Sequence, residues 1–126
     1  CLGMQLLATK CFEFENFDGL NWIPGKVNTI FEFNKKFKIP HVGWNSLNIT
    51  KTTDSIFKEF DGNDFYFIHS QSFKCDKKYI VATTNYNIDF VSVVRNDHIL
   101  GVQFHPEKSS IFGEKLIRNF INNKYD

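Results

Sequence analysis

The sequence opens with CLGMQLL (residues 1–7), a cysteine followed at once by apolar residues at helical spacing. With Gly3 two positions after Cys1, this pattern is the downstream half of a nucleophile elbow, a sharp strand–Cys–helix turn of α/β proteins. A cysteine in that turn lies at a helix N-terminus, where the dipole and the free N–H groups favour the thiolate. The amide of Leu2 is then directed toward an oxyanion on the attacked substrate. We therefore predict that Cys1 is a nucleophile.

A second stretch, GVQFHPEKS (residues 101–109), places His105 and Glu107 two positions apart. In an extended segment both side chains emerge on the same face, and Pro106 pushes the residue before it into an extended conformation. A carboxylate beside an imidazole fixes its tautomer and stabilises the imidazolium. A loop histidine beside a solvated glutamate is the common alternative. Together with Cys1, the pair predicts a Cys–His–Glu triad.

The rest of the chain predicts a mixed α/β structure with strands in the middle. Apolar residues at helical spacing predict a short helix over residues 2–9 and a second helix over residues 112–123. Aromatic and β-branched runs predict strands. These runs cover residues 27–33, 38–47, 64–70, 79–84, 90–95 and 98–104. The sequence RNDH (residues 95–98) predicts the turn of a hairpin.

Composition excludes several classes of function. The chain has 126 residues, 42% hydrophobic and 23% charged residues and a formal net charge of +1, as expected for one globular domain without a nucleic-acid footprint. No apolar run approaches the ~20 residues that a membrane span needs. Three cysteines without a CxxC motif favour a reducing cytoplasm. No Cys or His pair has the spacing of zinc ligands, so we expect no metal, and Cys11 and Cys75 are predicted to be small buried hydrophobic residues.

Five stretches carry a family resemblance. In chain order they are CLGMQLL, GLNWIPGKV, IPHVGWN, FYFIHS and GVQFHPEKS. Over essentially all of its length the chain resembles the class I (triad) glutamine amidotransferases, most closely the glutaminase subunits of imidazole glycerol phosphate synthases. The resemblance implies a doubly wound, flavodoxin-like α/β fold, with residues 1–126 forming the C-terminal portion of a single glutamine amidotransferase type 1 domain.

The resemblance also implies an activity and a partner. Such a subunit hydrolyses L-glutamine to glutamate and ammonia through a cysteine thioester, without a cofactor. It passes the ammonia to the synthase (cyclase) subunit in a cytoplasmic heterodimer of histidine biosynthesis. No nucleic-acid or membrane partner is implied.

Site residues follow motif by motif from the resemblance. Cys1 is the nucleophile, His105 the general acid and base, and Glu107 the residue that orients His105, while the Leu2 amide serves the oxyanion. Residues implied in substrate binding are Gln5, His69, Ser70 and Gln71. Residues implied at the synthase interface or near the ammonia exit are Trp44, Asn45 and Lys108. Alternatives stay open for three of these: Trp44 as core, His69 as a satisfied structural histidine, and Lys108 as a solvated side chain. His41 and His98 are left as structural or surface residues.

The resemblance carries two further expectations. Relatives have a segment before the nucleophile, with the strand that feeds the elbow and a loop that supplies a second oxyanion donor. We therefore expect residue 1 to be a truncation point, and this piece alone to be aggregation-prone and inactive. The family also has an aromatic residue after the FYFIHS strand, where this chain has Gln71, Ser72 and Phe73, so the shape of the substrate wall is open.

Other functions fit parts of the pattern. An N-terminal-nucleophile glutaminase would use the free amine of Cys1 as its base, which leaves His105 and Glu107 without a role. A paralogous amidotransferase would supply ammonia to a nucleotide-sugar or nonulosonic-acid synthase of surface polysaccharides, and it shares the motifs. A non-catalytic docking subunit and a free-standing γ-glutamyl peptidase are the alternatives of other classes.

Overall fold

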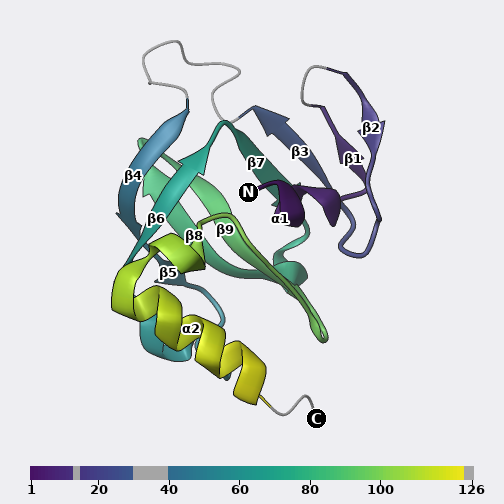
Figure 1. Cartoon of the computed structure of the whole chain (residues 1–126). Helices are drawn as coiled ribbons and strands as arrows, with labels where there is room; N and C mark the ends of the chain where they lie inside the picture. Colours follow the sequence, from purple (N-terminus) through teal and green to yellow (C-terminus); the bar gives the residue numbers. More distant parts are fainter. Residues whose placement is uncertain (13–14, 30–39, 124–126) are drawn as a thin grey trace.

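The computed structural model describes residues 1–12, 15–29 and 40–123. Two helices flank ten strands in this part of the chain (Figure 1). The helices are α1 (Leu2–Leu6) and α2 (Ser110–Asn122), and short 3-10 turns form at η1 (Lys58–Phe60), η2 (Lys77–Tyr79) and η3 (Pro106–Lys108). The strands are β1 (Lys10–Cys11), β2 (Phe17–Asp18), β3 (Gly25–Thr29), β4 (His41–Ser46), β5 (Asn48–Ile49), β6 (Asp64–His69), β7 (Gln71–Cys75), β8 (Ile80–Tyr86), β9 (Ile88–Asn96) and β10 (Ile99–Val102). The mixed α/β prediction is confirmed.

The strands form two sheets. The larger has eight strands in the order β2-β1-β3-β7-β9-β8-β5, with β10 pairing on β9, and the smaller consists of β4 and β6. Among the described strands, β1 and β3 form a parallel pair and the other pairs are antiparallel. The chain crosses from the small sheet to the large one between β6 and β7, at Ser70. This crossing lies close to the candidate site.

The predicted strands 38–47, 64–70, 79–84, 90–95 and 98–104 correspond to β4, β6, β8, β9 and β10. The strand predicted over residues 27–33 is seen as β3 up to Thr29, and residues 30–33 lie outside the described residues. The first helix ends at Leu6 instead of Thr9, because the Thr9 N–H bonds to the Gly25 carbonyl and turns the chain into β1. The sequence did not predict β1, β2, β5 or β7.

The hairpin predicted at RNDH is confirmed, and a second hairpin that the sequence did not predict joins β8 and β9. The β9–β10 hairpin turns at Asp97 and the β8–β9 hairpin at Asn87, with positive φ angles of 58° and 64°. Asp and Asn tolerate this left-handed conformation better than other side chains that carry a Cβ. No helix in the described ranges is long and apolar enough to cross a membrane.

Two apolar cores hold the sheets and helices together. The larger packs aromatic residues of β6, β9 and the segment after β10 against α2 through Leu116. The smaller joins Met4, Leu7 and Ala8, in and just after α1, to β3, β7 and β9. Burial of a side chain such as Met4 stabilises the fold by about 1.5–3 kcal/mol. The smaller core therefore fixes α1, and with it Cys1, against the large sheet.

Candidate active site

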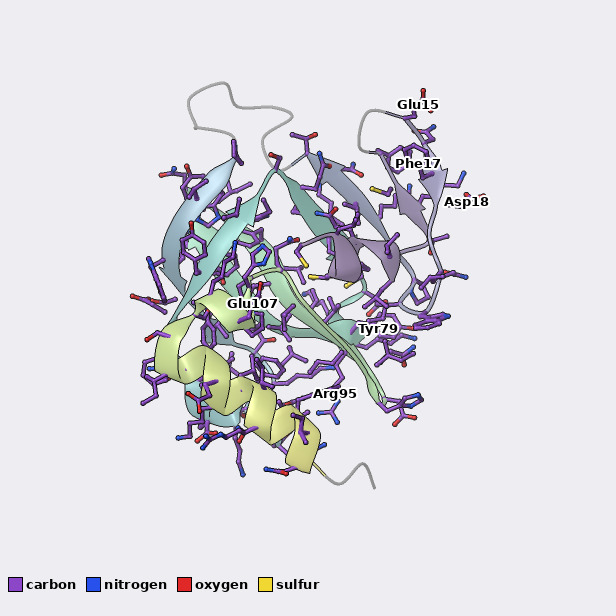
Figure 2. The ribbon with its side chains drawn as sticks, viewed as in Figure 1. Glu15, Phe17, Asp18, Tyr79, Arg95 and Glu107 are labelled. Carbon is purple, nitrogen blue, oxygen red and sulfur yellow. The ribbon has the colours of Figure 1, made fainter. Side chains whose placement is uncertain are left out.

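His105 and Glu107 form a hydrogen-bonded pair, as predicted. His105 Nδ1 lies 2.8 Å from Glu107 Oε1, and the two side chains are 23% and 59% exposed. His105 has the extended backbone expected before proline, with φ −103° and ψ 98°. The extended segment expected beyond it is wrong, because Pro106–Lys108 forms the 3-10 turn η3. The pair therefore forms across a turn. Figure 2 labels Glu107 beside the N-terminal end of α2.

The backbone of His105 is anchored to the free edge of β6. Its N–H donates to the Tyr66 carbonyl at 2.9 Å. The Ser109 hydroxyl accepts from the Tyr66 N–H at 3.0 Å and donates to the His105 carbonyl at 2.6 Å. Ser109 is fully buried. Residues 105–109 thus replace a strand partner along this edge, and they fix the position from which the imidazole projects.

A glycine allows α2 to approach this turn closely. A Cβ added at Gly113 would overlap the carbonyl oxygen of Pro106. The Gly113 N–H also donates to the Ser109 carbonyl at 3.1 Å. The second helix therefore packs directly on the turn that carries Glu107.

A backbone hydrogen bond links Cys1 to the segment just before His105. Cys1 is the N-cap of α1, and its backbone nitrogen donates to the Gln103 carbonyl at 2.8 Å. Gln103 is buried and precedes His105 by two residues. Leu2 is the first residue of α1, and N–H groups in the first helical turn have no partner within the helix. The hydrogen bonds of the described residues do not include one between Cys1 Sγ and His105.

The predicted substrate residues fall into two places. His69 ends β6, Gln71 begins β7 and the half-buried Ser70 lies between them. Gln5 is 7% exposed and lines a cavity of about 350 Å³ between α1 and the β1–β2 pair, together with Leu2. The structure therefore groups residues 69–71, while Gln5 borders a separate cavity.

Both ring nitrogens of His69 are occupied by protein groups. Nδ1 lies 2.8 Å from the Gln71 carbonyl oxygen and Nε2 lies 2.9 Å from His41 Nδ1. Burial lowers the pKa of His69 to about 4 against the opposing effect of the Gln71 carbonyl, and the charges of His41 and His105 lower it further. The ring is therefore neutral at pH 7 and has no nitrogen left for a direct bond to a substrate.

The predicted interface residues are accessible. Trp44 is 51% exposed and its ring packs on Tyr66, with ring centroids 5.6 Å apart. Asn45 is half-buried on the same strand, β4, and Lys108 is exposed in η3. Trp44 also lines a cavity of about 430 Å³ with residues 109–112, directly after Lys108. Trp44 therefore borders the segment that follows Lys108, whereas Asn45 contacts His41 and the Asn85 carbonyl.

The remaining cysteines differ from their prediction. Cys11 and Cys75 are only partly buried, at the border of the smaller core. Burial, with the charge of Asp76, raises the pKa of the Cys75 thiol to about 11, although Lys51 opposes the shift. Because a nucleophilic cysteine reacts as its thiolate, Cys75 is unreactive at neutral pH.

Comparison with known proteins gives the family. The family model described as "Glutamine amidotransferase class-I" matches residues 1–123. The chain belongs to the class I glutamine amidotransferases.

Among curated relatives, "Imidazole glycerol phosphate synthase subunit HisH" of Pelagibacter ubique (strain HTCC1062) is 44% identical in an alignment of 127 positions that covers 97% of this chain and 59% of that protein. "Imidazole glycerol phosphate synthase subunit HisH 2" of Vibrio vulnificus (strain YJ016) is 46% identical, over 97% of this chain and 56% of its own length. The HisH subunit of Archaeoglobus fulgidus (strain ATCC 49558 / DSM 4304 / JCM 9628 / NBRC 100126 / VC-16) is 41% identical, over 97% of this chain and 61% of its own length. The chain spans less than two thirds of the length of these relatives.

The contact between Glu107 and His105 is the one that an orienting carboxylate makes with an imidazole base. Burial by itself would raise the pKa of Glu107, but a bond to its own backbone N–H, the bond with His105 and the nearby positive charges outweigh it and lower the pKa. Glu107 is therefore a carboxylate at neutral pH. As an acceptor it requires a proton on His105 Nδ1, which leaves Nε2 to take and release protons.

Sequence reasoning missed the residues that support this pair. Ser109 lies in the GVQFHPEKS motif, which by itself gives it no role, and the sequence predicts only a strand position for Tyr66. Both act through the position of residues 105–109 along β6, for which a single sequence has no local signal. His41 is expected to be structural or at the surface, and the structure buries it.

Proposed function

We propose that this chain contains the catalytic residues of a glutaminase subunit of imidazole glycerol phosphate synthase, which hydrolyses L-glutamine to glutamate and ammonia. The observation that carries the proposal is the His105–Glu107 pair at 2.8 Å beside Cys1, whose backbone nitrogen bonds to Gln103. The HisH subunits that match 94–98% of this chain support it.

In the proposed reaction, the Cys1 thiolate attacks the side-chain amide carbon of glutamine, and the carbonyl electrons move to the oxygen. The Leu2 amide stabilises this oxyanion. As the intermediate collapses, the C–N bond breaks and imidazolium His105 gives a proton to the departing ammonia, which leaves a glutamyl thioester. His105 then takes a proton from water as the water attacks, the C–S bond breaks, and glutamate and the thiolate are released.

Glu107 supports both half-reactions without exchanging protons with the substrate. Its carboxylate stabilises the imidazolium that forms at His105 and holds the tautomer. Because the pKa of Glu107 is lowered in the fold, it stays ionised throughout the neutral range. Residues 69–71 are proposed to form the substrate wall, and Gln5 is proposed to contact glutamine from α1.

The ammonia is proposed to pass to a cyclase subunit, which completes a lyase reaction of histidine biosynthesis. Free ammonia would be protonated in bulk water, so a docked partner is required, and the two subunits form a heterodimer in the cytoplasm. The accessible Trp44, Asn45 and Lys108 are the proposed contact surface. Trp is a frequent anchor at such surfaces.

The test uses the complete gene product and its cyclase subunit. Glutamate release is measured with and without the cyclase, for wild type, Cys1→Ala and the matched control Cys75→Ala. We expect turnover that the cyclase increases, a loss of at least ~10³-fold in Cys1→Ala, and little change in Cys75→Ala. A glutamine-analogue electrophile should label Cys1.

Other outcomes would contradict the proposal. Turnover that does not respond to the cyclase indicates a free-standing hydrolase such as a γ-glutamyl peptidase. No turnover in either case indicates a docking subunit. Stimulation by a sugar-amidating synthase instead of the cyclase indicates the surface-polysaccharide paralogue, and labelling at Cys11 or Cys75 overturns the assigned nucleophile.

A further inference from the structure

A chain of hydrogen bonds runs through the interior from β4 to the start of β7. Asn45 Oδ1 lies 2.7 Å from His41 Nε2, and His41 Nδ1 lies 2.9 Å from His69 Nε2. His69 Nδ1 lies 2.8 Å from the carbonyl oxygen of Gln71. The contact between the two rings follows from cross-strand pairing, because His41 lies directly opposite His69 in the β4–β6 register. The catalytic mechanism uses neither histidine.

Both rings are fixed by aromatic neighbours. His41 is 1% exposed and stacks on Tyr86 and Phe67, with ring centroids 3.9 Å and 5.3 Å away and interplanar angles of 21°. His69 is 5% exposed and packs against Phe90, with centroids 4.8 Å apart. Side chains packed in this way occupy one rotamer. A displacement at one end of the pair therefore moves the other end, because neither ring changes its rotamer.

The acceptor at one end determines the tautomers. A backbone carbonyl only accepts, so His69 Nδ1 carries a proton and the neutral ring accepts at Nε2. His41 must then donate from Nδ1, which makes its Nε2 an acceptor. Burial lowers the pKa of His41 despite the contact with Asn45, so His41 is neutral at pH 7. For the amide NH₂ of Asn45 to donate to Nε2, the amide must rotate by 180°, which exchanges its oxygen and nitrogen and gives up the 3.3 Å bond from Asn45 Nδ2 to the Asn85 carbonyl.

The two ends of the chain lie in different functional regions. Asn45 follows the exposed Trp44 on β4, in the proposed cyclase-facing surface. Gln71 begins β7 after the crossing at Ser70, and its side-chain Nε2 donates to Thr29 Oγ1 on β3 at 3.1 Å. The hydrogen bonds therefore connect the small sheet to the large sheet through residues 69–71, which form the proposed substrate wall.

We propose that His41 and His69 are positioning residues for glutamine binding, which hold the Gln71 carbonyl and the 69–71 segment in place relative to Asn45 on β4. The proposal rests on the proposed glutaminase function. His69 acts here through the backbone of Gln71 and not by touching the substrate. A shift of β4 on contact with the partner is passed along the two rings to the substrate wall.

The first test replaces His41 in the complete gene product, assayed with its cyclase subunit. His41→Phe keeps a flat ring between Tyr86 and Phe67 but removes both hydrogen bonds, and His41→Asn keeps a donor near the Nδ1 position. A net hydrogen bond corresponds to about a tenfold factor in an equilibrium constant. We expect about a tenfold rise in the KM for glutamine in His41→Phe, with kcat per active site within about threefold, and partial recovery of KM in His41→Asn.

The control is His98→Phe, the same change at a histidine whose side chain is 68% exposed; it should leave KM unchanged. Active sites are counted by titration with the glutamine-analogue electrophile, so that unfolded protein does not enter kcat. An unchanged KM in His41→Phe, or a fall in kcat per active site alone, overturns the positioning role. An inactive wild type would instead contradict the proposed function.

A second test needs no variant. Nitrogen-15 NMR of the histidine rings reports which nitrogen carries the proton. We expect both His41 and His69 in the Nδ1–H form at pH 7. An Nε2–H form or a charged ring at either position overturns the hydrogen-bond chain.

Discussion

Replacing Ser109 with alanine should weaken the attachment of His105, the proposed general base, to β6. The Ser109 hydroxyl accepts from the Tyr66 N–H at 3.0 Å and donates to the His105 carbonyl at 2.6 Å, and the side chain is fully buried. The His105 carbonyl keeps its bond from the Lys108 N–H at 3.1 Å. The substitution therefore leaves one buried donor, the Tyr66 N–H, without a partner.

The magnitude follows from that single unpaired group. A buried donor without a partner costs about 1–3 kcal/mol. We expect the free energy of unfolding to fall by about 2 kcal/mol in Ser109→Ala. Because His105 loses one of its anchors, kcat should fall as well, and a misplacement of about 1 Å at a catalytic group can cost up to ~10²-fold.

The assay is urea unfolding of the complete gene product, with glutaminase turnover measured on the same preparation. Ser55→Ala is the matched control, because Ser55 is exposed and its hydroxyl bonds only to Asn123 at the surface. The control should change the free energy of unfolding by less than about 0.5 kcal/mol. If Ser109→Ala unfolds at the wild-type urea concentration, the bridging role of the hydroxyl is refuted.

Three further predictions concern charge. Glu107→Gln removes the carboxylate that stabilises the imidazolium, so steady-state kinetics should show kcat reduced by ~10²-fold or more at nearly constant KM; an effect on KM alone would contradict this. The pKa of His69 is lowered to about 4 in the fold, so the unfolded chain takes up the proton first. The free energy of unfolding should keep its full value above about pH 6.5 and fall by up to about 3 kcal/mol toward pH 4. A His69→Gln protein whose stability has the same pH dependence as wild type between pH 5 and 6.5 would argue against this role of His69. Asp54→Ala removes a buried carboxylate that pairs with Arg95 at 2.8 Å and caps two N–H groups, so urea unfolding should show a loss of about 2–4 kcal/mol, and an unchanged midpoint would refute it.

The sequence predicts the strands that have a strong local pattern and misses the others. β6 and β9 are rich in aromatic and β-branched residues and were found within one or two positions of their bounds. β7 has the sequence QSFKC, in which only Phe73 and Cys75 are apolar, an alternation too short to predict a strand; it pairs with β3 on one side and β9 on the other. β1, β2 and β5 have two residues each, too few for any periodicity.

The site was predictable where one short segment determines it. Pro106 restricts His105 to an extended conformation and Glu107 lies within reach two residues later, so the contact follows from this segment, although it forms across a 3-10 turn and predicts a site only together with Cys1. The His41–His69 pair depends on strand register. His69 has the same phase along β6 as the buried Phe65 and Phe67, a pattern that predicts a buried ring, but its partner is defined only once β4 pairs with β6.

β6 is the element on which these separate features meet. One of its edges pairs with β4, so that Trp44 lies opposite Tyr66 and His41 opposite His69. Its other edge carries residues 105–109 through the Tyr66 N–H and carbonyl, which hold Ser109 and His105. A displacement of β6 therefore moves the proposed general base and the proposed substrate wall together, because His105 is hydrogen-bonded to this strand and residues 69–71 continue from its end. The same geometry predicts that Ser109→Ala acts mainly on kcat and His41→Phe mainly on KM, although both residues contact one six-residue strand.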